Sequence, residues 1–251
     1  MGGPEGYDAA TYGEGIADVY DDLPTHPPDA DDAAAFLAEL AGTGPALELA
    51  IGTGRIALPL ARRGAHVSGI DASRAMVAKL RAKPDGERIP VTIGDFAAVD
   101  VDGRFGLVFV VYNTFFALLD QPTQQRCFER VAAHLTAGGR FVIEAFVPDT
   151  SRFERHQHLE VRHVGADGAL LSLSRHHPAT QRVDTLLVRL GGDGTRTWPV
   201  HIRYSYPSEL DLMAAQAGLR LEHRWGGWRR EPYTDDSVRH VSVYRAGDDA
   251  G

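Results

Sequence analysis

Residues 46–54 read Ala-Leu-Glu-Leu-Ala-Ile-Gly-Thr-Gly, an apolar run that ends in a turn with two glycines. A helix-like segment follows at residues 55–63, and a second apolar run at residues 66–70 leads into Asp71. Glycine permits backbone angles and close approaches that a Cβ would block, so this turn can lie against a bound molecule. An acid at the tip of the second strand is placed to accept hydrogen bonds from a ribose diol. The stretch therefore predicts a site for an adenosine-containing cofactor.

Length, composition and charge narrow the class of protein. The 251 residues suffice for one domain, and 43% hydrophobic and 24% charged residues are ordinary for a globular chain. No apolar run approaches the roughly 20 residues of a membrane span, and a net charge of −8 disfavours a nucleic-acid partner. Cys127 is the only cysteine, which excludes an internal disulfide and a cysteine-rich metal site. We expect a cytoplasmic protein with no metal, no nucleic-acid partner and no membrane partner.

Apolar runs alternate with helix-like segments through the first three-fifths of the chain. Continuous Val, Leu and Phe runs such as residues 107–111 are typical of strands buried on both faces of a parallel sheet. This alternation predicts a doubly wound α/β sheet with right-handed crossovers. The expected strands are 46–51, 66–70, 90–94, 105–111 and 140–146, and the expected helices are 10–23, a segment after Pro28 that runs through Leu40, 73–83 and 123–135.

The pattern changes after Asp149. Turn-forming residues such as Gly165-Ala166-Asp167-Gly168 and Gly191-Gly192-Asp193-Gly194 separate four short strand candidates, which should therefore pair antiparallel. Those candidates are 159–164, 169–175, 182–190 and 198–204, followed by a helix from Pro207 to near Gly218 and strands at 219–225 and 238–244. We expect one domain over residues 1–251, divided into an N-terminal helical part (1–42), a cofactor-binding core (43–150), an antiparallel β insertion (151–206) and the last part of the core sheet (207–251).

Charge is distributed unevenly along the chain. Residues 1–40 contain acids but no lysine or arginine, whereas residues 151–206 contain eight arginines and six histidines. These two regions either pack together, within one chain or across a dimer, or form two separate solvated faces.

Several motifs around the glycine turn narrow the choice of cofactor. The turn itself also satisfies the G-x-G-x-x-A pattern of dehydrogenases. However, Glu48 lies inside the first strand, where a dinucleotide fold usually keeps an apolar residue. Asp95 follows the third strand within Gly-Asp-Phe, and a glycine turn at residues 135–139 precedes the fifth strand. Taken together over residues 46–146, these features resemble the class I S-adenosylmethionine-dependent methyltransferases. One departure is Ala50, which stands where the family often has its first glycine.

The resemblance implies a Rossmann-like seven-stranded methyltransferase sheet with an N-terminal helical lid and an antiparallel β insertion after the fifth strand. It also implies S-adenosyl-L-methionine as the cofactor and a small molecule as the methyl acceptor. Ala50, Gly52 and Gly54 would line the turn beside the methionine moiety, and Glu48 would orient that turn. Asp71 would accept both ribose hydroxyls; its alternative role is to cap the helix that starts near residue 73.

Further residues of the cofactor site follow from the same resemblance. Ala72 and Met76 would pack on the adenine, Asp95 would accept from its exocyclic amine, and the Phe96 amide would meet a ring nitrogen. Tyr20, in the acidic N-terminal segment, would touch the methionine end, or else simply pack against the core.

The segment after the fourth strand is where the family brings methyl donor and acceptor together. Val111 would contact the cofactor, and Tyr112 and Asn113 would frame the sulfonium as the catalytic residues, since a cation is favoured by carbonyl oxygens and aromatic faces. The side chains expected to contact the acceptor are Phe116, Trp225 and Trp228. Phe116 is equally suited to an ordinary core position, and one of the two tryptophans to anchoring a surface loop.

The acceptor atom stays open between N and O. The charge of the acceptor stays open as well, because the basic, histidine-rich insertion suits an anion such as a carboxylate, whereas the acidic N-terminal segment suits an amine. The histidines show no zinc-binding spacing and name no general base, and a neutral amine needs none. The layout is also similar to that of bacterial natural-product enzymes, including sugar N-methyltransferases. The insertion would then cover the acceptor pocket or form a homodimer interface. Two alternatives are an NAD(P)-dependent dehydrogenase and a non-catalytic S-adenosylmethionine-binding protein.

Overall fold

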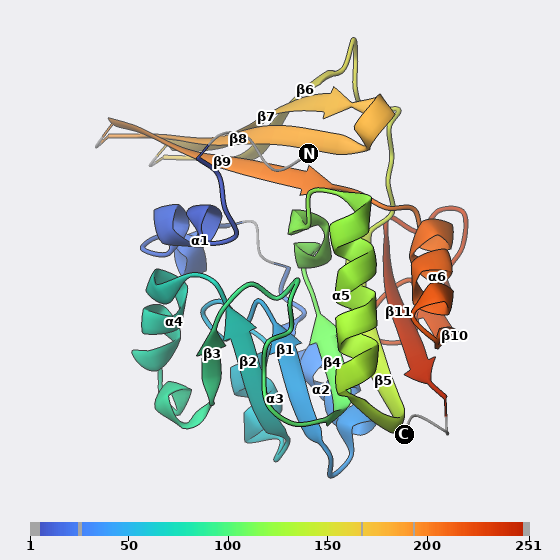
Figure 1. The fold of residues 1–251 in the computed structure, drawn as a ribbon. Coiled ribbons are helices and arrows are strands. Elements are labelled where there is room, and N and C mark those ends of the chain that lie inside the picture. Colours follow the sequence, from blue (N-terminus) through green and yellow to red (C-terminus); the bar gives the residue numbers. More distant parts are fainter. Residues whose placement is uncertain (1–5, 25–26, 167, 193, 248–251) are drawn as a thin grey trace.

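The computed structural model describes residues 6–24, 27–166, 168–192 and 194–247, which form two sheets and the helices around them (Figure 1). The larger sheet has the strand order β10-β11-β5-β4-β1-β2-β3. Its strands are β1 (Pro45–Leu49), β2 (His66–Asp71), β3 (Val91–Ile93), β4 (Phe105–Val110), β5 (Leu135–Phe146), β10 (Leu219–Trp225) and β11 (Arg239–Ala246). The pairs among β1–β5 are parallel, and β11 is antiparallel to β5 and β10. The expected doubly wound sheet is confirmed, with its topological switch point between β1 and β4.

Helices cover both faces of this sheet (Figure 1). Phe36 and Leu60 pack from α2 and α3 on one face, and Phe128 and Leu210 pack from α5 and α6 on the other. The helices of these two layers are α2 (Ala30–Ala41), α3 (Ala57–Arg62), α4 (Arg74–Arg81), α5 (Gln121–His134) and α6 (Pro207–Gln216), with the 3-10 turns η2 (Gly86–Arg88) and η3 (Thr114–Ala117). A further 3-10 turn, η4 (Pro178–Thr180), belongs to the second sheet. In the described part of the chain, no helix is long and apolar enough to span a membrane.

The N-terminal segment forms two short pieces rather than the single helix expected over residues 10–23. These pieces are α1 (Thr11–Ile16) and the 3-10 turn η1 (Tyr20–Asp22). Ile16, Val19 and Leu23 are all buried in one apolar cluster with side chains of α4 and of the second sheet. The helical spacing of the apolar residues therefore indicated which residues are buried, but tertiary packing and not helix propensity sets their backbone path.

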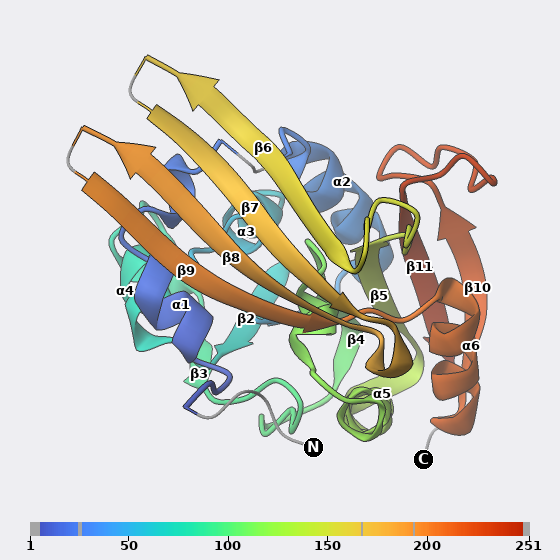
Figure 2. The same cartoon turned by 90° about the horizontal axis from the view of Figure 1, so that it is seen from above.

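The second sheet follows β5 and consists of β6 (Gln157–Gly165), β7 (Gly168–His177), β8 (Arg182–Gly191) and β9 (Gly194–Arg203) in sequential antiparallel order (Figure 2). It confirms the antiparallel insertion, although all four strands extend into residues that the sequence assigned to turns. Asp167 and Asp193 of those turns lie outside the described residues. One face, with Leu170 and Trp198, is buried, whereas Leu173 on the other face is 45% exposed.

The fifth strand begins earlier than expected. Residues 135–139 were expected as a glycine turn before the strand, but β5 already pairs with β4 at Leu135. The register then shifts, and the next two residues that pair are Leu107 and Arg140. Gly138, with φ +67°, accommodates the extra residues in this irregular stretch.

The turn after β1 depends on left-handed backbone. Ala50, Gly52 and Gly54 have φ angles of +55°, +55° and +79°. Alanine thus keeps the backbone conformation for which the family often uses glycine, at a cost of about 1–2 kcal/mol. Gly54 is restricted by packing as well, because a Cβ there would lie 2.4 Å from Leu80 Cδ1, whereas a Cβ on Gly52 would meet nothing closer than 3.9 Å.

These two glycines give a matched test of the turn. Gly52→Ala should lower the free energy of unfolding by about 1–2 kcal/mol, because only the positive φ is unfavourable. Gly54→Ala should lower it by about 2–4 kcal/mol, because overpacking against Leu80 is added. Urea unfolding of the two variants measures the difference. Equal losses would show that Leu80 moves aside freely and that the packing described for Gly54 is wrong.

Candidate active site

The carboxyl edge of the large sheet brings the sequence-predicted motifs together. The glycine turn follows β1, Asp71 ends β2, and the segment from Val111 to Asn113 follows β4. In Figure 1, α1 lies between this part of the molecule and β9 of the second sheet. Ligands of doubly wound sheets bind at this edge beside the switch point, so we take it as the candidate active site.

Asp71 bridges two elements at this edge. Its Oδ2 accepts from the Gly52 amide at 2.7 Å and its Oδ1 accepts from the Ser73 amide at 2.8 Å. Burial raises the pKa of this carboxyl. The cap of α4 is made by the Ser73 side chain, which accepts from the Met76 amide. Because each carboxylate oxygen has a second lone pair, Asp71 can still accept two hydroxyl donors of a diol.

The residues expected around the adenine lie beside this bridge. Ala72 follows Asp71 directly, and Met76, on α4, is buried in the cluster under the N-terminal segment. Asp95 is exposed after β3, and its Oδ1 accepts from the Ala97 amide at 2.8 Å. Phe96 is buried in the core, which leaves its backbone rather than its ring for a ligand.

Two buried polar atoms next to the glycine turn, one from an acidic and one from a basic side chain, have no hydrogen-bond partner. They are Glu48 Oε2 and Arg55 Nη1. Burial raises the pKa of Glu48 well above its usual range, while the charge of nearby Arg55 acts in the opposite direction. Arg55 Nη1 lies 3.6 Å from Asp29 Oδ1, in an ion pair too long for a hydrogen bond. The ammonium group of an amino-acid zwitterion can donate to Glu48 Oε2, and its carboxylate can accept from the Arg55 guanidinium. These residues therefore fit the methionine end of S-adenosylmethionine.

Glu144 is a member of the site that the sequence analysis did not single out. It accepts from the Tyr112 amide, it lies 4.0 Å from Arg239, and burial raises its pKa. Asn113 adds a second link to β5, because its Oδ1 accepts from the Phe146 amide at 2.6 Å. Tyr112 and Asn113 have φ angles of +56° and +63°, so these bonds hold a left-handed turn after β4. The signal for Glu144 was available: like Glu48, it is an acid inside an apolar strand.

Three tyrosines lie near one another on this side of the molecule, Tyr12, Tyr20 and Tyr112. Burial raises the pKa of both Tyr12 and Tyr20, with further contributions from the neighbouring phenols. Both are therefore neutral phenols at physiological pH. The Arg55 guanidinium carbon lies 5.1 Å from the centre of the Tyr112 ring, which ties the glycine turn to the segment after β4. Tyr12 lies in the same acidic N-terminal segment as Tyr20, and the sequence offered both as candidates.

The side chains expected at the acceptor lie deeper than a contact role requires. Phe116 is fully buried, with its ring 5.0 Å from that of Phe146 in an edge-to-face pair. Trp228 is 4% exposed and packs on Phe36 of α2. Trp225, half-buried, stacks on His223. Phe116 and Trp228 are thus core residues, and their positions favour the packing alternative.

The buried Glu48 predicts a pH dependence of stability. A carboxyl whose pKa is raised on folding stabilises the protein below the pKa of the unfolded chain, near 4.3, and this contribution is lost as pH rises through the folded value. Glu48→Gln removes the ionisable group but keeps its shape. The Tm of the variant should therefore gain on that of the parent protein as pH rises from 5 to 8. Parallel Tm curves over this range would mean that Glu48 is not held in its neutral form.

Comparisons with known proteins show the family of this chain. A family model described as a methyltransferase domain matches residues 46–139. The chain is 39% identical to the CcbJ methyltransferase from Streptomyces caelestis, with a TM-score of 0.91 over 96% of this chain and 100% of that one. It is 28% identical to the cypemycin N-terminal methyltransferase of Streptomyces sp over 78% of this chain and 81% of that one.

A solved structure of an amino pentose methyltransferase from Micromonospora echinaspora, with S-adenosylmethionine bound, shares the fold. Its TM-score is 0.66 at 21% identity, over 86% of this chain and 89% of that one. The agreement in motif, fold and cofactor chemistry displaces the dehydrogenase alternative. The chain belongs to the class I S-adenosylmethionine-dependent methyltransferases.

Proposed function

We propose that this enzyme transfers the methyl group of S-adenosylmethionine to an amino nitrogen of a small molecule in bacterial secondary metabolism. The observation that carries the cofactor half of the proposal is the pair of buried atoms on Glu48 and Arg55 that lack hydrogen-bond partners beside the glycine turn. The relatives support the other half, since the cypemycin enzyme is named for methylating an N-terminus.

The chemistry of the site favours nitrogen over oxygen. The side chains that the described structure brings together here are carboxyl groups, the Arg55 guanidinium, an asparagine and neutral phenols, and none of them is a histidine. A neutral amine attacks without a base, whereas an alcohol usually benefits from one.

The cofactor roles expected from the sequence remain part of this proposal. S-adenosylmethionine, when bound, supplies an activated methyl group on a sulfonium. Asp71 binds its ribose, Glu48 and Arg55 bind its amino-acid end, and Tyr20 covers it from the N-terminal side. The remaining residues proposed to contact it are Ala50, Gly52, Gly54, Ala72, Met76, Asp95, Phe96 and Val111.

We assign Tyr112 and Asn113 different roles on the side of the site where the acceptor binds. Tyr112 lies at the end of β4 with its ring under Arg55, and we assign it to framing the methyl group. Asn113 positions Tyr112, because its side chain is bonded to the backbone of β5. Rate acceleration then comes largely from alignment of the nucleophile with the methyl carbon, at about 3–3.5 Å.

The proposal is tested with labelled S-adenosylmethionine and a panel of amino sugars, peptide N-termini and matched alcohols. We expect N-methylated products and S-adenosylhomocysteine from amines only. Asn113→Gly keeps the positive φ and removes the side chain, so it should lower kcat about ten- to a hundredfold through misplacement of Tyr112, with cofactor affinity within about twofold. O-methylation alone would overturn the choice of nitrogen. Cofactor binding without any transfer would favour the non-catalytic alternative, and lost affinity with unchanged kcat would move Asn113 to the cofactor.

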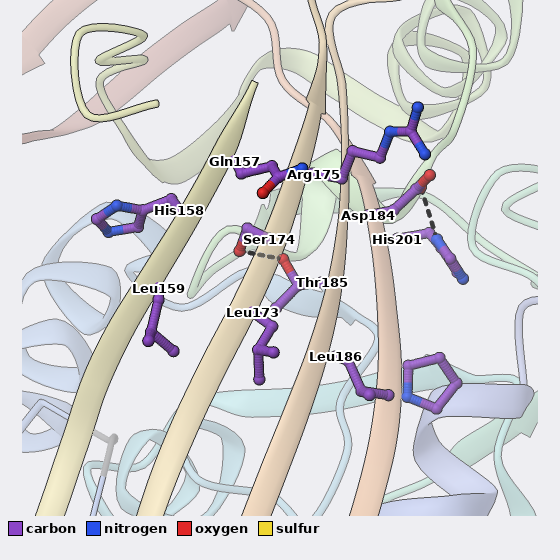
Figure 3. A pocket seen from close by; sticks show the side chains of 11 residues that line it. Gln157, His158, Leu159, Leu173, Ser174, Arg175, Asp184, Thr185, Leu186 and His201 are labelled. Atoms are coloured by element: carbon purple, nitrogen blue, oxygen red, sulfur yellow. Dashed lines mark hydrogen bonds and ion pairs between the residues drawn. The ribbon is translucent and has the colours of Figure 1, made fainter. Parts of the chain in front are cut away.

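We also propose that the chain acts as one domain with the divisions 1–42, 43–150, 151–206 and 207–251, and as a homodimer through the insertion. The outer face of the insertion is apolar: Leu159, Leu173 and Leu186 occupy one register row across β6, β7 and β8 (Figure 3), and they are 63%, 45% and 39% exposed. Exposed apolar patches of this kind mark interaction sites.

A second copy of the chain is the occupant that suits this face. The next row holds Arg175 and Asp184, so both signs of charge are present and the face can pair with itself around a two-fold axis. Strands of nine or ten residues at about 3.4 Å each, four abreast at about 4.8 Å, give roughly 500–600 Å² per copy. Two copies would bury about 1,000–1,200 Å², near the lower limit of stable interfaces.

Light scattering with size-exclusion chromatography measures the oligomeric state. The parent chain should run as a dimer, and Leu173→Asp should run as a monomer because it buries a charge at the centre of the face. Leu212→Asp, at a position 67% exposed on α6, is the matched control and should remain a dimer. A monomeric parent chain at micromolar concentration, or a dimeric Leu173→Asp variant, would contradict the assignment.

A further inference from the structure

The N-terminal segment, defined here as residues 11–23, connects the insertion to the cofactor site. It is too short to be helical on its own, since isolated helices below about 12–15 residues are marginal in water. Its apolar side chains share one buried cluster with Met76 of α4 and with Leu170 and Trp198 of the insertion. The position of the segment therefore depends on contacts with both α4 and the insertion.

On the cofactor side, the segment is bonded to the glycine turn. Asp21 Oδ1 accepts from Thr53 Oγ1 at 2.6 Å, and Thr53 is the buried residue between Gly52 and Gly54. Lys83 completes the group, with its Nζ 2.7 Å from Asp21 Oδ2 and 2.8 Å from the Thr53 carbonyl oxygen.

A second bond group joins α1 to the start of α4. Glu14 Oε1 accepts from Ser73 Oγ at 3.0 Å and from the Ala75 amide at 3.1 Å. Ser73 is the residue whose amide donates to Asp71. The approach is close, because a Cβ on Gly13 would lie 2.5 Å from the Ser73 Cβ. The N-terminal segment thus contacts Thr53 in the glycine turn and Ser73, which lies two residues after Asp71.

On the insertion side, β9 holds the same segment. Trp198, buried, donates from Nε1 to the Gly15 carbonyl oxygen at 2.8 Å, which satisfies a carbonyl near the end of α1. Arg196, two residues earlier on the same face, donates to both carboxylate oxygens of Asp18 at 2.9 and 3.1 Å. This ion pair joins the acidic N-terminal region to the basic insertion within one chain.

We propose that Trp198 and Arg196 of β9 are positioning residues for the cofactor. They hold the N-terminal segment in place, so that Asp21 stays hydrogen-bonded to Thr53 in the glycine turn. The proposal rests on the proposed function, because the site it tunes is the cofactor site. It assigns the insertion a role in cofactor retention, separate from its proposed role in the dimer. Most of the effect should come through Trp198, since the Arg196–Asp18 pair is largely exposed and such pairs are weak.

Calorimetry with S-adenosylhomocysteine tests this on the full-length chain. Trp198→Phe keeps an aromatic ring and removes the N–H donor, and it should raise Kd about three- to tenfold, the equivalent of one lost hydrogen bond. Arg196→Gln should raise Kd by at most about threefold. The control is Arg189→Gln, because Arg189 is the exposed cross-strand neighbour of Arg196 on β8, and its Kd should stay at the parent value.

Hydrogen exchange and a double-mutant cycle separate positioning from a merely structural effect. Trp198→Phe should speed amide exchange in residues 11–23 while Tm changes little. Asp21→Ala should also weaken binding, with Asp22→Ala as the control at the next, exposed position. If Trp198 acts through the hydrogen bond between Asp21 and Thr53, adding Trp198→Phe to Asp21→Ala should have little further effect on Kd.

Additive losses in this cycle, or faster exchange in Trp198→Phe with an unchanged Kd, would overturn the proposal. A parent protein that does not bind S-adenosylhomocysteine would instead overturn the proposed function, so the two failures are distinguishable.

Discussion

The carboxylate of Asp71 joins the two elements on which the rest of the site depends. It accepts from the Gly52 amide in the turn after β1 and from the Ser73 amide at the start of α4. Without a common acceptor, both amides would need other partners at this crowded edge. The same carboxylate keeps lone pairs for a ligand, so one group both shapes the turn and presents the binding surface. The N-terminal segment, through Asp21 and Glu14, contacts residues directly next to this bridge.

The site is formed at some expense in stability. Glu48, Asp71 and Glu144 are buried carboxyls whose pKa values are raised, and Glu48 Oε2 and Arg55 Nη1 have no hydrogen-bond partner, although Arg55 Nη1 lies 3.6 Å from Asp29 Oδ1. Unpaired buried polar groups typically cost about 1–3 kcal/mol each. Left-handed residues at Ala50, Tyr112 and Asn113 add backbone strain at the same edge. Concentration of unfavourable terms in one place is typical of a binding site whose ligand supplies the missing partners.

Much of the core could be predicted from the sequence because it depends on local pattern. Continuous apolar runs identified the buried strands, and the acids Glu48 and Asp71 stood out because each sits in or directly after such a run. Other features depend on contacts between distant segments. Nothing near Asp21 in the chain indicates that it bonds to the glycine turn, and nothing near Trp198 indicates that it bonds to α1. Arg55 looked like an ordinary helix residue. Phe116 and Trp228 showed the opposite problem, since aromatic residues beside a predicted site were as consistent with packing as with an acceptor. The irregular start of β5 could not be predicted, because glycines indicate a turn but do not show whether strand pairing continues through it.

A crystal structure with S-adenosylhomocysteine bound tests the central claim most directly. The account predicts both ribose hydroxyls within about 3.2 Å of the Asp71 carboxylate oxygens, and the amino-acid end of the ligand between Glu48 and Arg55. A ribose bound away from Asp71, or an amino-acid end that leaves both Glu48 and Arg55 without a partner, would contradict it.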